Sequence, residues 1–137
     1  MAVVTDATFQ TAVIERSMTV PVVVDLWAEW CGPCKQLGPI IEKVIAATDG
    51  QVELAKVDVD ANPNIAQAFR VQSIPAVFAI RDGRPVDQFI GALPEAEIVE
   101  FVAKLLPTKE QTEVERLIEA GDEASLRAAM ELEPDNA

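Results

Sequence analysis

The residues best suited to chemistry are two cysteines, Cys31 and Cys34, which flank a Gly-Pro pair directly after Trp30. At this spacing two thiols can close into a small disulfide ring with little rearrangement of the chain. If a helix begins here, its free backbone amides and partial positive charge stabilise a thiolate on the first of the two, Cys31. We therefore predict a reversible dithiol–disulfide couple, with Cys31 as the exposed nucleophile and Cys34 as the covered thiol that resolves the intermediate.

The two residues between the cysteines fit this interpretation. Pro33 falls in the first turn of the expected helix, where a missing backbone amide is tolerated. Gly32 removes side-chain bulk at the place where a substrate disulfide would approach. We therefore expect both residues to border the substrate.

A zinc site is the main alternative to redox chemistry, because Cys-x-x-Cys also forms half of many zinc knuckles. Zinc needs four protein ligands, or three ligands and a water molecule. The chain contains no histidine and only two cysteines. We therefore expect no metal site, and the Gly-Pro insert beside Trp30 also disfavours an inert buried pair.

A further candidate is Asp25, the one charged residue in an apolar, β-branched stretch that ends at Trp27. Burial of an ionised carboxylate is costly, and loss of hydration raises its pKa. Asp25 either faces water at a sheet edge or is a buried group that transfers protons near the nucleophile. We favour the second alternative, in which Asp25 accepts the Cys34 proton. Lys56 is either an ordinary solvated residue or the partner of Asp25, and the pattern does not choose between them.

The cysteines lie at the junction between a predicted buried strand and a predicted helix. Residues 20–27 form a nearly continuous apolar run, which is typical of a central strand covered on both faces. After the cysteines, apolar residues recur at helical spacing up to Asp49 and Gly50, with Pro39 as an expected kink. The other predicted elements are strands at 51–58, 76–80 and 86–90, the last two joined by a turn at Asp82-Gly83, and helices at 62–69 and 94–106. This alternation indicates an α/β fold.

The composition limits the partners of the chain. Its 137 residues, half of them apolar, suffice for one sizeable core but not for two full domains. Eleven basic and twenty-three acidic side chains give a formal net charge of −12, which repels phosphate backbones and anionic lipids. The N-terminus does not read as a signal peptide, and the longest apolar run is too short to span a bilayer. We expect a cytoplasmic protein with no nucleic-acid or membrane partner.

The character of the chain changes near Pro107. The last 31 residues hold nine acidic and three basic side chains, and so carry half of the net charge of −12. Short apolar runs around Leu117 and Leu126 predict two short helices with little core of their own. We therefore predict one domain at residues 1–107 and an acidic helical hairpin at 108–137.

The stretch from Asp25 to Lys35, Asp-Leu-Trp-Ala-Glu-Trp-Cys-Gly-Pro-Cys-Lys, resembles the thioredoxin family. The resemblance extends over residues 3–106, about three quarters of the chain, and rests on several separated motifs. It implies a thioredoxin fold, in which four helices flank a five-stranded mixed sheet. It also implies a monomeric protein-disulfide reductase with no bound cofactor, which receives electrons from NADPH through thioredoxin reductase. Its clients would be disulfide-containing or unfolded proteins.

The same resemblance gives roles to several other residues. Asp25 matches the buried acid of the family, and Lys56 matches the lysine that approaches it. Pro75 matches the cis-proline that faces the disulfide, although the sequence by itself leaves this bond trans. The chain departs from the family at Ala76, where threonine is usual, and this departure affects the expected client preference and not the chemistry.

A substrate groove beside the disulfide is also implied by the resemblance. Its borders would be Trp30, Val59, Ile74, Gly91 and Ala92. The family binds an extended segment of its client in this groove through backbone contacts beside the cis-proline. From the residues alone Trp30 is either core or an exposed lid, and we favour the lid, with Trp27 in the core.

The end of the chain resembles a second family. The stretch from Ala128 to Asn136 is similar to the second helix and exit turn of a tetratricopeptide repeat, whose units need stacked neighbours for stability. Thioredoxin domains followed by such repeats form a family of co-chaperones, the chaperedoxins. The alternative function is therefore a redox-capable holdase that captures unfolded clients with its tail and with the apolar groove near Ile74.

Overall fold

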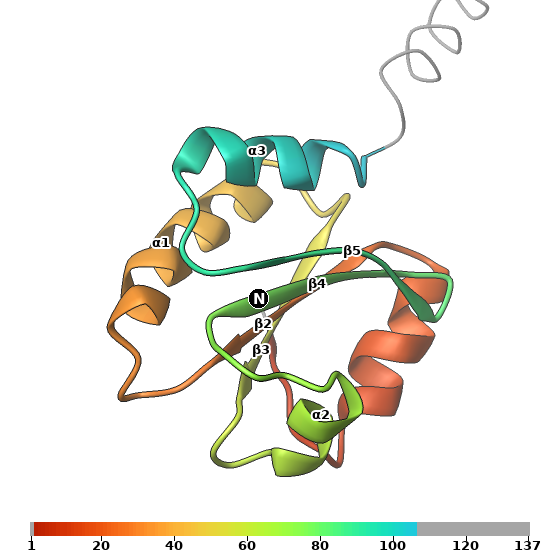
Figure 1. Cartoon of the computed structure of the whole chain (residues 1–137). Helices are drawn as coiled ribbons and strands as arrows, with labels where there is room; N and C mark the ends of the chain where they lie inside the picture. The colour runs from red at the N-terminus through yellow and green to blue at the C-terminus, as the bar shows by residue number, and fades with distance from the viewer. Residues whose placement is uncertain (1, 107–137) are drawn as a thin grey trace, which may run out of the picture. The chain divides into compact units, whose positions relative to one another are not determined.

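The computed structural model describes residues 2–106 of the chain (Figure 1). Their strands form one five-stranded mixed sheet in the order β1-β3-β2-β4-β5. The strands are β1 (Ala2–Val3), β2 (Val22–Trp27), β3 (Glu53–Asp58), β4 (Ala76–Arg81) and β5 (Arg84–Ile90). The helices are η1 (Gln10–Glu15), η2 (Arg16–Met18), α1 (Gly32–Ala46), α2 (Pro63–Ala68) and α3 (Glu95–Ala103). The predicted five-stranded mixed sheet with flanking helices is confirmed.

Strand β2 occupies the centre of the sheet. It runs parallel to β3 and antiparallel to β4, so both of its edges are hydrogen-bonded. Alternate side chains of a strand point to opposite faces. Val22, Val24 and Leu26 join the core cluster that also contains η1 and α2 residues. Asp25 and Trp27 alternate with them along β2 and so point to the opposite face of the sheet. Helix α1 covers that face (Figure 1). Cover on both faces explains why this strand is apolar almost throughout.

The hairpin at Asp82 and Gly83 is confirmed. Both residues have positive φ angles, 55° and 81°, as a tight two-residue turn between antiparallel strands requires. Strand β5 begins at Arg84, two residues earlier than predicted, and its pairing with β4 shifts register between Ala79 and Ile80. The hairpin therefore places β5 at one edge of the sheet. Helix α3 packs on this strand through Phe101, whose ring contacts that of Phe89 (Figure 1).

The pattern does not predict β1 or the helical segment formed by η1 and η2. Val13 of this segment is fully buried. Ser17 Oγ donates to the Ile14 carbonyl oxygen at 2.6 Å and accepts from the Gly83 amide at 2.9 Å. The segment therefore holds the β4–β5 turn. The four-residue spacing of Phe9 and Val13 was a usable signal, whereas a strand of two residues is too short to show alternation.

Helix α2 begins after Asn62, as predicted, but its cap comes from the N-terminal segment. The Asp6 carboxylate accepts hydrogen bonds from the Asn64 amide at 3.3 Å and from the Ile65 amide at 3.0 Å. Asn62 Oδ1 accepts instead from the Asp6 amide at 2.8 Å. Free amides at a helix start need such acceptors, so Asp6 fixes where α2 begins.

The core of the described chain closes with α3 and the turn after it. Phe101, Val102 and Leu105 are buried, and the Leu105 carbonyl oxygen accepts a hydrogen bond of 2.7 Å from Arg81 Nη2. None of the helices between residues 2 and 106 combines the length and the apolar character that crossing a bilayer requires. The predicted boundary near Pro107, the acidic hairpin and the repeat-like stretch at 108–137 lie outside the described residues.

A chain that ends at Pro107 should fold by itself, because one compact unit comprises Met1–Leu105. Removal of residues 108–137 should change the free energy of unfolding by less than about 1 kcal/mol. Urea unfolding of the full and the shortened chain, followed by tryptophan fluorescence, measures this difference. A shortened chain that is unfolded without denaturant would show that the domain boundary is wrong.

Candidate active site

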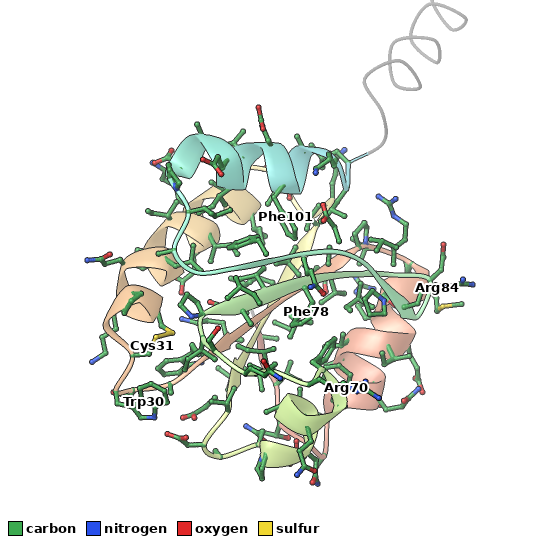
Figure 2. All side chains as sticks on the ribbon, in the orientation of Figure 1. Trp30, Cys31, Arg70, Phe78, Arg84 and Phe101 are labelled. Atoms are coloured by element: carbon green, nitrogen blue, oxygen red, sulfur yellow. A yellow bond between two sulfur atoms is a disulfide. The ribbon has the colours of Figure 1, made fainter. Side chains whose placement is uncertain are left out.

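The two cysteines meet where β2 leads into α1. Cys31 is the N-cap residue of α1, and Cys34 lies in its first turn (Figure 2). Their sulfur atoms form a disulfide, and their Cα atoms lie 5.3 Å apart. The Cys34 amide donates to Cys31 Sγ at 3.2 Å, so the sulfur of Cys31 accepts a hydrogen bond from the helix N-terminus. The predicted redox-active disulfide at a helix start is therefore present.

The expected difference in exposure between the two cysteines is wrong for this disulfide form. Cys31 is 3% exposed and Cys34 is 4% exposed. The two sulfurs share one apolar cluster with Ala28, against which Trp27, Val59 and Ile74 also pack. What distinguishes the cysteines here is position, because Cys31 caps the helix and Cys34 lies inside it.

The Trp30 side chain lies on the surface beside Cys31, outside the core (Figure 2). It is 69% exposed, and its indole Nε1 donates to Asp60 Oδ2 at 2.8 Å. Trp27 is half-buried beneath the disulfide. The sequence does not single out Asp60, because nothing in its spacing indicates that the loop after β3 comes back to the indole.

The loop before β4 faces the disulfide from the other side. The Ile74–Pro75 peptide bond is cis, and the Pro75 carbonyl oxygen accepts a hydrogen bond of 2.8 Å from the Gly91 amide. Gly91 has a φ of 92°, which favours glycine, and Ala92 after it is exposed. Ala76 is fully covered where β4 begins. The structure therefore brings Gly91 next to Pro75, although they are far apart in the sequence.

A groove of about 330 Å³ extends from Trp30 toward α2. Trp30, Val59 and Ile74 line it, whereas Gly91 and Ala92, the other two expected border residues, do not. The opposite wall was missed and consists of Pro63, Ala66, Gln67, Val71, Gln72 and Ser73. Gly32 and Pro33 are exposed at the start of α1. An extended polypeptide could therefore reach the disulfide along a surface that is mostly apolar and carries amide side chains.

Asp25 lies in the interior and not at a sheet edge. It is 1% exposed, and no described residue donates a hydrogen bond to its Oδ1 atom. Loss of hydration raises the pKa of Asp25 to about 6, with the positive charge of Lys56 lowering it and the negative charge of Glu42 raising it. The carboxyl group can therefore change its protonation state near neutral pH.

Lys56 is neither a freely solvated residue nor a direct partner of Asp25. It stands beside Asp25 in the register of β2 and β3, so the two side chains leave the sheet on the same face. Its ammonium nitrogen instead contacts Glu42 Oε2 on α1, at 3.0 Å. The sequence analysis did not identify Glu42, because its position between apolar helix residues reads as an ordinary solvated one.

No cluster of three or more metal-ligating side chains occurs within residues 2–106. The structure places the disulfide and the buried Asp25 carboxyl on the same face of the sheet, the one that α1 covers. The site is made of sulfur, one buried carboxyl group and an apolar groove.

Comparison with known proteins agrees with this geometry. The family model described as Thioredoxin matches residues 1–104. Thioredoxin 1 of Synechococcus elongatus is 40% identical over 105 residues, which cover 77% of this chain and 96% of that protein. The thioredoxin of Chlorobaculum thiosulfatiphilum is 45% identical over 98 residues, 72% of this chain and 89% of that protein. A bifunctional thioredoxin reductase/thioredoxin of Mycobacterium leprae is 40% identical over 104 residues, 76% of this chain and 22% of that protein.

Burial of Asp25 should make folding stability depend on pH. Below about pH 3 its carboxyl is neutral in the folded chain and mostly neutral in the unfolded chain, so it contributes little difference. Its folded pKa of about 6 lies above the value in the unfolded chain. The folded state therefore loses stability as pH rises from the unfolded pKa to the folded pKa. Asp25→Asn should therefore be more stable than wild type near pH 7, by about 2 to 3 kcal/mol, and the difference should fall to about 0.5 kcal/mol near pH 4.

Urea unfolding of both oxidised proteins at the two pH values measures this difference directly. Other carboxyl groups titrate in both proteins and cancel in the comparison. A stability difference that stays the same from pH 4 to pH 7 would show that the Asp25 carboxyl has an ordinary pKa.

Proposed function

Because this chain belongs to the thioredoxin family and is a thiol–disulfide oxidoreductase that reduces protein disulfides, we propose that Cys31 attacks the client and Cys34 resolves the intermediate. The observation that carries the proposal is the disulfide across the start of α1. A reductase must be able to close this bond after each turnover. The structure holds the closed, oxidised form.

The reaction begins with the reduced dithiol. The Cys31 thiolate attacks one sulfur of the client disulfide, and the other client sulfur leaves as a thiolate and takes up a proton. Cys34 then loses its proton and attacks Cys31 Sγ, which releases the second client sulfur. The client gains two electrons and two protons, and the Cys31–Cys34 disulfide forms.

The choice of Cys31 as nucleophile is supported by its place at the N-cap. A thiolate here receives the hydrogen bond from the Cys34 amide and the favourable field of the helix N-terminus. Cys34 lies inside the first turn of the helix, where its sulfur does not receive the hydrogen bond that the helix start gives to Cys31. Its thiol should therefore keep its proton until a base removes it.

Asp25 is the proposed base for Cys34. It lies on the face of β2 that α1 covers, as does the cysteine cluster, and its pKa of about 6 lets it be ionised near neutral pH. An ionised carboxyl group in this apolar region favours transfer of a proton to itself. Proton transfer through a water molecule would connect it with Cys34. Lys56 supports this role by stabilising the ionised form of Asp25.

The groove between Trp30 and α2 is the proposed client site, and it is lined up to Ile74, the residue before Pro75. An extended client segment would lie beside Pro75 and make backbone contacts, while the loop at Gly91 and Ala92 borders it on the other side. Gly32 and Pro33 leave room for the approaching disulfide. Such backbone recognition suits a reductase that acts on many proteins, and the groove could equally hold unfolded segments.

The proposed electron donor is thioredoxin reductase, with NADPH as the source of electrons. A relative from Mycobacterium leprae is named bifunctional thioredoxin reductase/thioredoxin. This name supports thioredoxin reductase as the electron donor. The reduced dithiol also has to persist between turnovers, and a reducing compartment maintains it. We therefore propose that the protein acts in the cytoplasm. We also propose that it acts as a monomer, as the family resemblance implies.

The order of events at the two sulfurs can be tested by trapping. Cys34→Ser should attack oxidised insulin and stop as a covalent mixed disulfide, because no thiol remains to displace the client. Cys31→Ser should trap essentially none, because Cys34 lacks the N-cap position. Mass spectrometry of each variant after mixing with excess oxidised insulin detects the adduct. Equal adducts on both variants, or an adduct only through Cys34, would mean that the nucleophile is wrongly assigned.

The role of Asp25 can be tested through the rate of the resolving step. In wild type this rate should rise with pH as Asp25 loses its proton near pH 6. Asp25→Asn should slow the step by about tenfold or more near pH 7 and flatten its pH dependence. Stopped-flow tryptophan fluorescence of the dithiol mixed with oxidised insulin measures it, with Asp87→Asn as the matched loss of an acid elsewhere. Unchanged rates and an unchanged pH profile would remove Asp25 from the mechanism.

A further inference from the structure

The Lys56 ammonium lies between two carboxyl groups and contacts only one of them. Lys56 pairs with Asp25 in the β2–β3 register, which places both side chains on the α1 face of the sheet. Its Nζ atom nevertheless lies 3.0 Å from Glu42 Oε2. Among the described residues no hydrogen bond joins Lys56 to Asp25, and Asp25 Oδ1 has no donor at all.

Helix α1 and β2 hold the ammonium in this position. Its nitrogen lies 5.1 Å from the centre of the Trp27 ring, a favourable distance for a cation–π contact. A Cβ atom at Gly38 would come within 3.6 Å of the same nitrogen, so Lys56 reaches the backbone of α1. The ammonium is therefore fixed by α1 on one side and the Trp27 ring on another.

We propose that Glu42 is a positioning residue of the redox site, which holds the Lys56 ammonium against α1 and limits the charge compensation that Lys56 can give to Asp25. The Lys56 side chain is 20% exposed and that of Glu42 is 40% exposed. The ion pair thus lies at the border between solvent and the buried carboxyl group. The significance of Glu42 for turnover rests on the proposed function of Asp25 as the base for Cys34.

The charges around Asp25 come from two elements. Lys56 on β3 lowers the pKa of Asp25, and Glu42 on α1 raises it. On the remaining neighbour, β4, the residue paired with Asp25 is the apolar Val77, and the two cysteines of α1 are joined in the disulfide. Loss of the Glu42 charge should therefore act twice on Asp25, because it removes a nearby negative charge and releases Lys56 toward it.

The test is an NMR titration of the Asp25 side-chain carboxyl carbon in the oxidised protein, where neither cysteine titrates. Glu42→Gln should lower the proton affinity of Asp25 about tenfold relative to wild type. Glu42→Asp, which keeps the charge, should titrate closer to wild type. Glu95→Gln is the matched control, since it breaks an ion pair between α3 and Lys43 of α1 that does not include Lys56.

A double-mutant cycle with Lys56→Met separates positioning from the direct effect of charge. If Glu42 acts through Lys56, the effect of Glu42→Gln should fall to less than half once Lys56 is absent. An unchanged Asp25 titration in Glu42→Gln would overturn the proposal, and so would an equal effect in both backgrounds. Because this titration involves no turnover, it tests Glu42 separately from the kinetic test of Asp25.

Discussion

The rest of the site depends on the burial of a carboxyl group in the central strand. Strand β2 is covered on both faces, and Asp25 is almost completely removed from water there. Its carboxyl group has Lys56 nearby but no direct ion pair, so loss of hydration dominates and raises its pKa to about 6. In the proposed function this buried group has a use, because an acid of that strength can exchange protons with a thiol near neutral pH.

The same strand also delivers the sulfur chemistry. Strand β2 ends at Trp27, and a short turn leads from it to α1. Cys31 is the N-cap residue of that helix. The helix N-terminus supplies a hydrogen bond to the Cys31 sulfur, whereas Cys34 lies inside the first turn, and one apolar cluster contains both cysteines. Two sulfurs three residues apart thus receive different electrostatic surroundings although both are buried in the disulfide form.

The groove is assembled from segments that come from three parts of the chain. Trp30 follows β2, Val59 follows β3, and the segment from Pro63 to Ile74 contains α2 and leads to β4. Asp6 caps α2 and so positions the far wall, and Asp60 orients the Trp30 indole. Helix α1 contributes Glu42, which holds Lys56 beside Asp25 without letting it neutralise the acid. The proposed client binding and proton transfer therefore depend on contacts that are long-range in the sequence.

The chemistry and the local elements could be predicted from the amino-acid sequence. The spacing of Cys31 and Cys34, the apolar strand around Asp25 and the turn at Asp82-Gly83 are local patterns, so they predicted the disulfide couple, β2 with α1, and the hairpin. Tertiary structure alone decided that both cysteines are covered, that Lys56 pairs with Glu42 and that Gly91 meets Pro75. Those facts depend on which side chains come into contact after the sheet and helices pack. Hydrophobic periodicity indicates local secondary structure and does not predict such contacts.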